Sequence, residues 1–140
     1  MRIFFDTNVI ISAIVTMGGS FGVIKDSVYK HEIFYTDYLL KETRKILTSK
    51  FPLPDKIING AVSLIRRYFI KGKTAEKAAE VCRDPDDNQL LADAVVNKIE
   101  IFVTGDKDLL VLKEYQGVRI IPPKDYWTLP ALPRGKKGLT

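Results

Sequence analysis

Acidic side chains are the residues of this chain with the clearest capacity for chemistry. Asp6 follows the apolar run Ile3-Phe4-Phe5, and Asp106 follows the apolar run 101–103 by way of Thr104 and Gly105. A short continuous apolar run is typical of a strand covered on both faces, as in a parallel sheet. Because ligands of open parallel sheets bind beyond the carboxyl ends of the strands, both aspartates are predicted to face one crevice. The alternative for each is that it caps the next helix.

The segment Asp84-Pro85-Asp86-Asp87-Asn88 is the densest acidic part of the chain. It has a structural explanation, with Asp84 as N-cap, Pro85 at the first helical position and Asp87 as the acid of a capping box. Three acids at one helix start repel each other, however, and the helix dipole offsets only a few tenths to about 1 kcal/mol of that repulsion. Glu42 lies at the edge of the apolar stripe of its helix, where the alternative is an ordinary surface glutamate.

Several carboxylates in one pocket cannot all stay ionised unless a cation is close. Oxygen ligands of this kind favour Mg²⁺ or Mn²⁺. Such a metal lowers the pKa of a bound water, orients it and neutralises charge on a phosphate oxygen. The acids therefore predict metal-assisted chemistry on a phosphate ester.

The scarcity of other catalytic side chains narrows the choice. The 140 residues include one histidine, His31, and one cysteine, Cys82. A paired-histidine ribonuclease mechanism is thereby excluded, and a Ser-His-Asp or Cys-His mechanism would depend on His31 alone. Zinc sites of the His/Cys type lack ligands. His31 follows a predicted helix in the polar stretch Lys30-His31-Glu32 and is predicted to be a solvated surface residue.

The elements that must position the acids alternate along the chain. Short apolar runs predict strands at 3–5, 33–35, 101–103 and 118–121. Helical patterns cover residues 9–16, 21–29, 36–49, 55–68, 74–81, 84–96 and 106–113. This alternation predicts an α/β fold with a mainly parallel sheet. We expect one domain over residues 1–127 and a flexible basic tail over 128–140, which is rich in Pro, Gly, Lys and Arg.

Charge and hydropathy bear on location and partners. The formal net charge is +5, from 22 Lys and Arg against 17 Asp and Glu, which is compatible with phosphate-bearing partners. No apolar run reaches the roughly 18–20 residues that span a bilayer, and no signal peptide is recognisable. We expect a cytoplasmic protein without a membrane segment, in a reducing compartment that suits a single cysteine. Candidate RNA contacts, each otherwise a solvated surface cation, are Arg44, Arg66, Arg67, Lys136 and Lys137.

Four segments, in this order, resemble the acidic motifs of PIN-domain ribonucleases. They are Phe5-Asp6-Thr7-Asn8-Val9, the segment Leu39 to Leu47 around Glu42, the segment Asp84 to Ala94, and Val103-Thr104-Gly105-Asp106-Lys107-Asp108-Leu109-Leu110. Each motif is short, whereas the ordered set is specific and spans nearly the whole chain. Within the family, the chain is most similar to the toxin-like, VapC-type prokaryotic subgroup, through its Asp-Pro-Asp-Asp-Asn signature.

The resemblance implies a three-layer α/β/α sandwich and Mg²⁺- or Mn²⁺-dependent cleavage of RNA. Many relatives are toxins that a small antitoxin protein holds inactive, and many form homodimers. Carried over residue by residue, the catalytic and metal-binding acids are Asp6, Glu42, Asp87 and Asp106. The supporting positions are Thr7, Asn8, Thr104 and Asp84, with Asp108 as a reserve for the fourth acid.

Other functions fit the same residues less well. A haloacid dehalogenase-type phosphatase needs a second aspartate two residues after the first, and Asn8 stands there. Gly72-Lys73-Thr74 is similar to the end of a P-loop, but the first glycine of such a loop would fall at Arg67. The remaining alternative is a PIN-like module that binds RNA or a protein without cutting, which the presence of all four acids disfavours.

Overall fold

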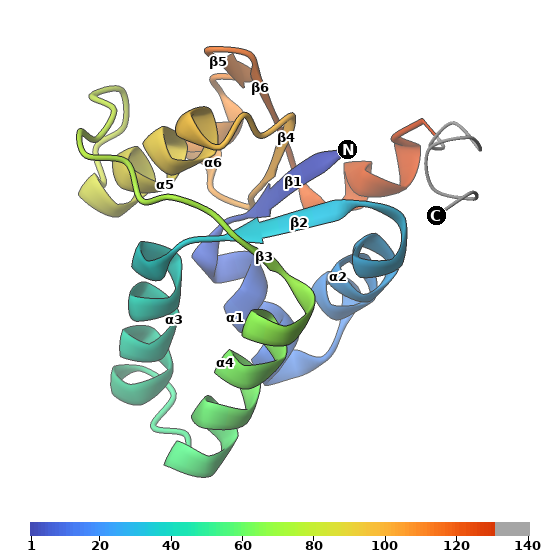
Figure 1. The fold of residues 1–140 in the computed structure, drawn as a ribbon, viewed down its shortest axis with the longest axis vertical. Helices are drawn as coiled ribbons and strands as arrows, with labels where there is room; N and C mark the ends of the chain where they lie inside the picture. The colour runs from blue at the N-terminus through green and yellow to red at the C-terminus, as the bar shows by residue number, and fades with distance from the viewer. Residues whose placement is uncertain (131–140) are drawn as a thin grey trace.

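A six-stranded sheet forms the centre of the computed structural model, which describes residues 1–130 (Figure 1). Its strands are β1 (Arg2–Phe5), β2 (Glu32–Tyr35), β3 (Ile70–Lys71), β4 (Ile101–Val103), β5 (Glu114–Tyr115) and β6 (Val118–Ile121). They lie in the order β3-β2-β1-β4-β6-β5, and only the β5–β6 pairing is antiparallel. The strand order therefore reverses direction at β1 and β4, which places a topological switch point between their carboxyl ends.

Helices cover both faces of this sheet. They are α1 (Thr7–Thr16), α2 (Gly19–Lys30), α3 (Asp37–Ser49), α4 (Asp55–Tyr68), α5 (Pro85–Val96), α6 (Lys107–Leu110) and the 3₁₀ helix η1 (Pro123–Thr128). Figure 1 shows α1 to α4 on one side of the sheet and α5 with α6 on the other. The predicted α/β/α sandwich with a mainly parallel sheet is confirmed.

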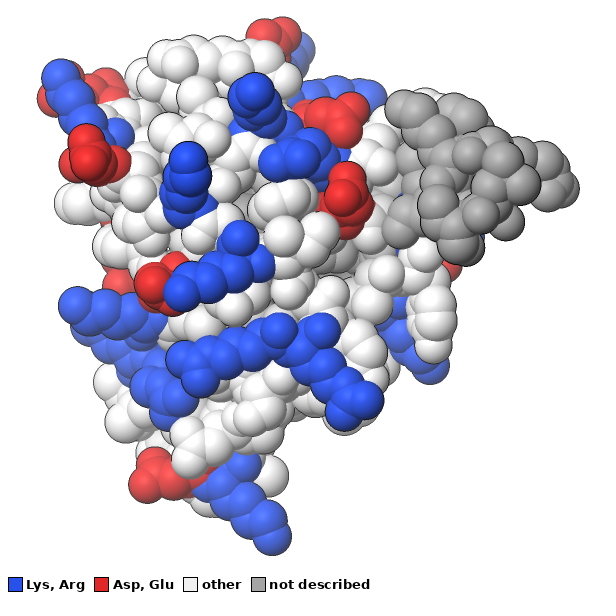
Figure 2. Space-filling view, viewed as in Figure 1, with Lys and Arg blue, Asp and Glu red and all other residues white. Residues whose placement is uncertain are grey.

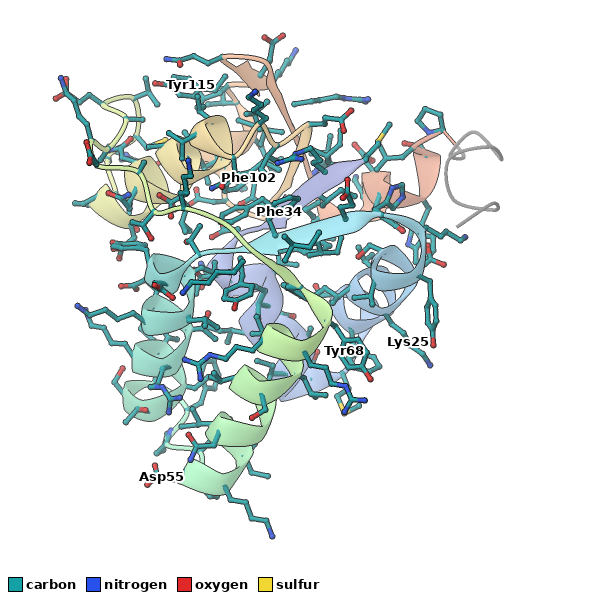
Figure 3. The ribbon with its side chains drawn as sticks, viewed as in Figure 1. Lys25, Phe34, Asp55, Tyr68, Phe102 and Tyr115 are labelled. Atoms are coloured by element: carbon teal, nitrogen blue, oxygen red, sulfur yellow. The ribbon has the colours of Figure 1, made fainter. Side chains whose placement is uncertain are left out.

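The apolar strands are buried on both faces, as their sequence predicts. Ile3, Phe4 and Phe5 of β1 are all 0% exposed, and the Phe4 ring centroid lies 5.7 Å from that of Phe102 on β4. Figure 3 shows Phe34 and Phe102 inside the fold, among the strands. This rigid centre holds the ends of β1 and β4 in place, so the residues that follow these strands are well positioned.

The helix predicted over residues 74–81 is wrong. Side chains of α5 instead bind the backbone of this segment, which runs without regular structure. Asn97 accepts the Lys73 N–H at 2.9 Å and donates to the Lys73 carbonyl at 2.8 Å, and Asp93 accepts the Ala75 N–H at 2.7 Å. Asn88 accepts the N–H groups of residues 81 and 82. Backbone groups that a helix would pair internally thus find partners in α5.

Three smaller expectations also need correction. The helix predicted over 106–113 is shorter in the structure, where α6 ends at Leu110 and β5 follows after a turn. The two-residue strands β3 and β5 are too short for any periodic pattern to reveal them. His31 is 7% exposed rather than solvated, because the distant η1 brings Tyr126 against its ring in an edge contact with centroids 5.8 Å apart. No local sequence pattern near His31 predicts that contact.

Within residues 1–130, no single helix is long and apolar enough to cross a membrane. The pair α1 and α2 passes that test only when both are taken together, across a bend of 110°.

Candidate active site

Asp6 lies at the switch point, directly after β1. Its N–H continues the sheet by donating to the Val103 carbonyl at 2.9 Å. The side chain stands at the N-cap position of α1 but makes no capping hydrogen bond. Its Oδ2 instead accepts a hydrogen bond of 2.7 Å from the Thr104 hydroxyl, which follows β4. Both side chains are buried, at 2% and 0% exposure. The bond from Thr104, rather than capping of α1, is therefore the main hydrogen bond of the Asp6 carboxylate, which is held toward the end of the neighbouring strand.

Asp106 joins this pair through the same threonine. Its N–H donates to the Thr104 Oγ1 at 3.0 Å, so one hydroxyl connects the backbone of Asp106 with the carboxylate of Asp6. Asp106 also caps α6, because its Oδ1 accepts the Asp108 N–H at 2.8 Å. For Asp106 the capping explanation is correct, and it occupies one carboxylate oxygen.

Asp87 approaches the same point from α5. Asp84 is the N-cap of that helix and accepts the Asp86 N–H at 2.9 Å, while Pro85 takes the first position. Asp87 is consequently not needed as a cap. It is 6% exposed, and its Oδ2 is buried without a hydrogen-bond partner among the described residues. An acceptor left in this state is costly unless a cation or donor reaches it.

Burial and the neighbouring acids raise the pKa values of Asp6 and Asp87. Burial raises the pKa of Asp6 from 3.8 to about 6; the Thr104 hydroxyl opposes this rise and the charge of Asp106 adds to it. Burial also raises the pKa of Asp87, helped by its contact with the Asp106 carboxyl and by the charge of Asp6. Asp6, Asp87 and Asp106 therefore form one electrostatic cluster, which we call the inner acids.

Glu42 belongs to a second group beside the first. Burial raises the pKa of Glu42, and the carboxylate of Asp86 is the next largest cause. Asp86 in turn accepts a hydrogen bond from the Tyr38 hydroxyl. Since Tyr38 and Glu42 are four residues apart on α3, they share a face that looks toward the start of α5. Glu42 is half-buried and so is not the ordinary surface glutamate of the alternative reading.

The supporting positions differ in where they point. Thr7 is buried, and its Oγ1 has no hydrogen-bond partner among residues 1–130. Asn8 is exposed and lines a groove of about 320 Å³ that α1 and α3 border. Asp108 forms a two-pronged ion pair with Arg83, with distances of 3.1 and 3.0 Å. That pairing engages both carboxylate oxygens of Asp108, whereas Asp106 shares Thr104 with Asp6.

Whether these residues suit a divalent metal follows from their donor atoms. Within residues 1–130, no group of three or more His, Cys, Asp or Glu side chains converges in metal-ligating geometry. Hydrogen bonds instead engage the carboxylates individually, as the Thr104 bond to Asp6 shows. The donor set nevertheless fits Mg²⁺ or Mn²⁺, because it is made of carboxylate oxygens and includes the unpartnered Oδ2 of Asp87.

Cations gather on the neighbouring surface. Figure 2 shows Lys and Arg side chains in a band across α3 and α4. We call this band the basic face; its exposed members are Lys41, Arg44, Lys45, Arg66 and Arg67. A hydrogen bond of 2.9 Å from Arg44 to Asn59 links the two helices. The predicted contacts Lys136 and Lys137 lie outside the described residues.

Sequence reasoning missed two residues of this region, Asp86 and Tyr38. Asp86 was seen only as part of an acidic run, although helical spacing puts it next to Asp87 and one residue beyond the proline. Tyr38 precedes Glu42 by one turn, a spacing that places both on one helix face. The bond between Tyr38 and Asp86 joins residues 48 positions apart, which no local pattern predicts.

Comparisons with known proteins identify the family and the fold. Residues 2–108 match the family model described as PIN domain. An uncharacterized protein of Methanocaldococcus jannaschii is 32% identical over 119 residues, covering 81% of this chain and 76% of that protein. The fold is similar to a chain of VapBC2 from Rickettsia felis, solved as a crystal structure bound to a DNA fragment from its promoter. That likeness has a TM-score of 0.65 at 12% identity and covers 87% of this chain and 98% of the other. At so low an identity it speaks for the fold alone.

Proposed function

Because this chain belongs to the PIN-domain family, we propose that it is a metal-dependent endoribonuclease that hydrolyses RNA phosphodiester bonds. The observation that carries the proposal is the cluster of inner acids at the switch point, with Glu42 beside it. Burial and mutual repulsion raise the pKa values of Asp6 and Asp87. Strongly perturbed acids in one crevice are typical of catalytic sites.

The side chains divide the work between them. Asp6, Glu42, Asp87 and Asp106 would hold Mg²⁺ or Mn²⁺, which when bound activates a water and neutralises charge on a phosphate oxygen. The Thr104 hydroxyl keeps the Asp6 carboxylate oriented toward the cluster. Capping ties one oxygen of Asp106 to the backbone and leaves the other for a ligand.

The basic face supports RNA as the substrate. Its cations lie on α3 and α4, and α3 also carries Glu42. Cations next to an acidic centre attract the phosphate backbone, whereas the centre itself repels it. This arrangement favours a long polyanion that touches both surfaces over a small phosphate ester.

A toxin role is the more specific part of the proposal. The similar Rickettsia felis structure is of a VapBC2 complex bound to promoter DNA, and the sequence motifs resemble toxin-like PIN domains. We therefore propose that a small antitoxin protein binds and inhibits this chain, that the chain forms a homodimer, and that it acts on RNA in the cytoplasm.

The test is cleavage of a mixed RNA pool by purified protein in Mg²⁺, in Mn²⁺ and in chelator. We expect cleavage with either metal and none in chelator, and a loss of at least about 100-fold in Asp6→Ala, since removing one group that stabilises charge in a transition state costs about that much. Asp55→Ala is the matched control, because Asp55 is exposed at the far end of α4 (Figure 3). Full activity in chelator contradicts the metal mechanism. Intact RNA under every condition favours the non-catalytic binding module instead.

A further inference from the structure

Tyr38 has an unusual place beside the acids. It lies in the first turn of α3, one turn before Glu42, and its ring packs partly buried against the main core. Its hydroxyl donates a hydrogen bond to Oδ1 of Asp86. A phenol in this setting is held firmly, because the ring is packed and the hydroxyl has a charged acceptor.

Asp86 is free to take this bond because the helix start does not use its carboxylate. Asp84 accepts the Asp86 N–H as N-cap, so the Asp86 side chain is not needed to cap α5. It turns across to α3, where its carboxylate lies close enough to Glu42 to disfavour the charge of that glutamate. Asp86 therefore stands between Tyr38, Glu42 and its own neighbour Asp87.

We infer that Tyr38 is a positioning residue: its hydroxyl anchors Asp86 and so fixes how Glu42 on α3 and Asp87 on α5 are presented to one divalent cation. This inference rests on the proposed metal-dependent function. Without the hydroxyl, Asp86 loses its hydrogen bond from α3 and is less well fixed beside Glu42. Binding a cation would then require both carboxylates to be reordered, and affinity falls when ligands are not preorganised.

A second bond between the same helices keeps the fold independent of Tyr38. The hydroxyl of Thr36, the N-cap of α3, donates to Oδ2 of the fully buried Asp93 on α5 at 2.7 Å. Asp93 also accepts from the Ala75 N–H and from Gln89. This network fixes the base of the two helices, so loss of the Tyr38 hydroxyl should disturb the acids locally and leave the fold intact.

The chain offers a matched control for the variant Tyr38→Phe. Tyr126 also donates its hydroxyl to an aspartate, Asp26, at 2.6 Å. That bond joins η1 to α2 and lies beside His31, at the end of β2 opposite to Tyr38. Tyr126→Phe thus removes the same kind of bond at a place without the acids.

The experiment is a Mn²⁺ titration of the whole chain, followed by the electron paramagnetic resonance signal of free Mn²⁺, with the melting temperature measured alongside. For Tyr38→Phe we expect Mn²⁺ affinity about 10-fold weaker, equivalent to about 1.4 kcal/mol and in the range of one hydrogen bond to a charged group. Tyr126→Phe should bind Mn²⁺ like the wild type. If Tyr38 acts through Asp86, adding Tyr38→Phe to Asp86→Ala should weaken binding no further than Asp86→Ala alone, because alanine leaves the hydroxyl without its acceptor.

The outcomes distinguish a failure of the positioning role of Tyr38 from a failure of the proposed nuclease function. Equal Mn²⁺ affinity in Tyr38→Phe and the wild type overturns the positioning role and leaves the proposed nuclease standing. An equal loss in Tyr126→Phe also overturns it, since the effect would then be general. A wild type that binds no Mn²⁺ overturns both. Should Tyr38→Phe fail to fold, Asp86→Ala decides: wild-type affinity in that variant overturns the inference, because the anchored residue would then not matter.

Discussion

Replacing Asp6 with asparagine should stabilise the metal-free protein at alkaline pH, although the change removes the central acid of the site. Asp6 is 2% exposed, and its pKa is raised from 3.8 to about 6 mainly by burial. The folded protein therefore keeps this proton to a higher pH than the unfolded chain does. Stability from Asp6 is fully present below about pH 4 and is lost as the pH rises through about 6. Asparagine is neutral throughout and can still accept the Thr104 hydrogen bond.

The size of the effect follows from the two pKa values. A pKa rise from 3.8 to about 6 corresponds to about 3 kcal/mol of free energy of unfolding, at 1.36 kcal/mol for each pH unit. The stability difference between Asp6→Asn and the wild type should thus shift by about 3 kcal/mol in favour of the variant between pH 4 and pH 8, or roughly 10 °C in melting temperature. A divalent metal at about 1,000 times its Kd should reverse the order at pH 8, because it adds about 4.1 kcal/mol to the wild type only.

The assay is thermal unfolding by circular dichroism at several pH values, in chelator and in Mn²⁺. Asp55→Asn makes the same chemical change at an exposed position and serves as the control. Parallel pH profiles for Asp6→Asn and the wild type in chelator would refute the claim that Asp6 is a buried, destabilised charge. A metal that stabilises both proteins alike would refute its role as a ligand.

Two further predictions concern the surface and the loop. Replacing the three arginines of the basic face with glutamine should weaken RNA binding. The slope of log K against log salt should fall by up to about 0.7 for each lost contact with single-stranded RNA, as measured by fluorescence anisotropy. An unchanged slope would show that RNA does not bind this face. A Cβ at Gly72 would lie 2.6 Å from the Oδ1 of Asn97, so Gly72→Ala should cost about 1–3 kcal/mol as hydrogen bonds of Asn97 break. Gly60→Ala, on an exposed part of α4 with open space, should instead stabilise by up to about 1 kcal/mol, and denaturant unfolding of both variants checks the contrast.

The parts of the fold that the sequence predicts are those that follow from local patterns. The run Ile3-Phe4-Phe5 is apolar at every position, so it has one stable location, a doubly covered strand. Thr36 signals the start of α3, and its Oγ1 does accept the Leu39 N–H at 3.3 Å. The segment 74–81 misled because its helical pattern is real, but the side chains of α5 compete for the same backbone groups. Tertiary contacts of that kind cannot be predicted from a short stretch of sequence.

Most of the candidate site followed from chain order and the shape of the sheet. Asp6 and Asp106 are 100 positions apart, yet both follow strands that pair in parallel, and that pairing alone brings them to one edge. Glu42 and Asp86 could not be paired in this way, since their contact depends on the tilt of two helices on opposite faces of the sheet. His31 shows the same limit, because the residue that buries it arrives with η1.

Helix capping and metal binding were the two explanations for each acidic segment, and they involve different atoms of the same segment. At the start of α5, Asp84 does the capping, and this leaves Oδ2 of the buried Asp87 without a hydrogen-bond partner among the described residues. After β4, Asp106 caps α6 with one oxygen, while its backbone N–H binds the threonine that orients Asp6. Helix capping therefore does not compete with a cation site here. It supplies the rigid helix starts from which the remaining carboxylate oxygens project.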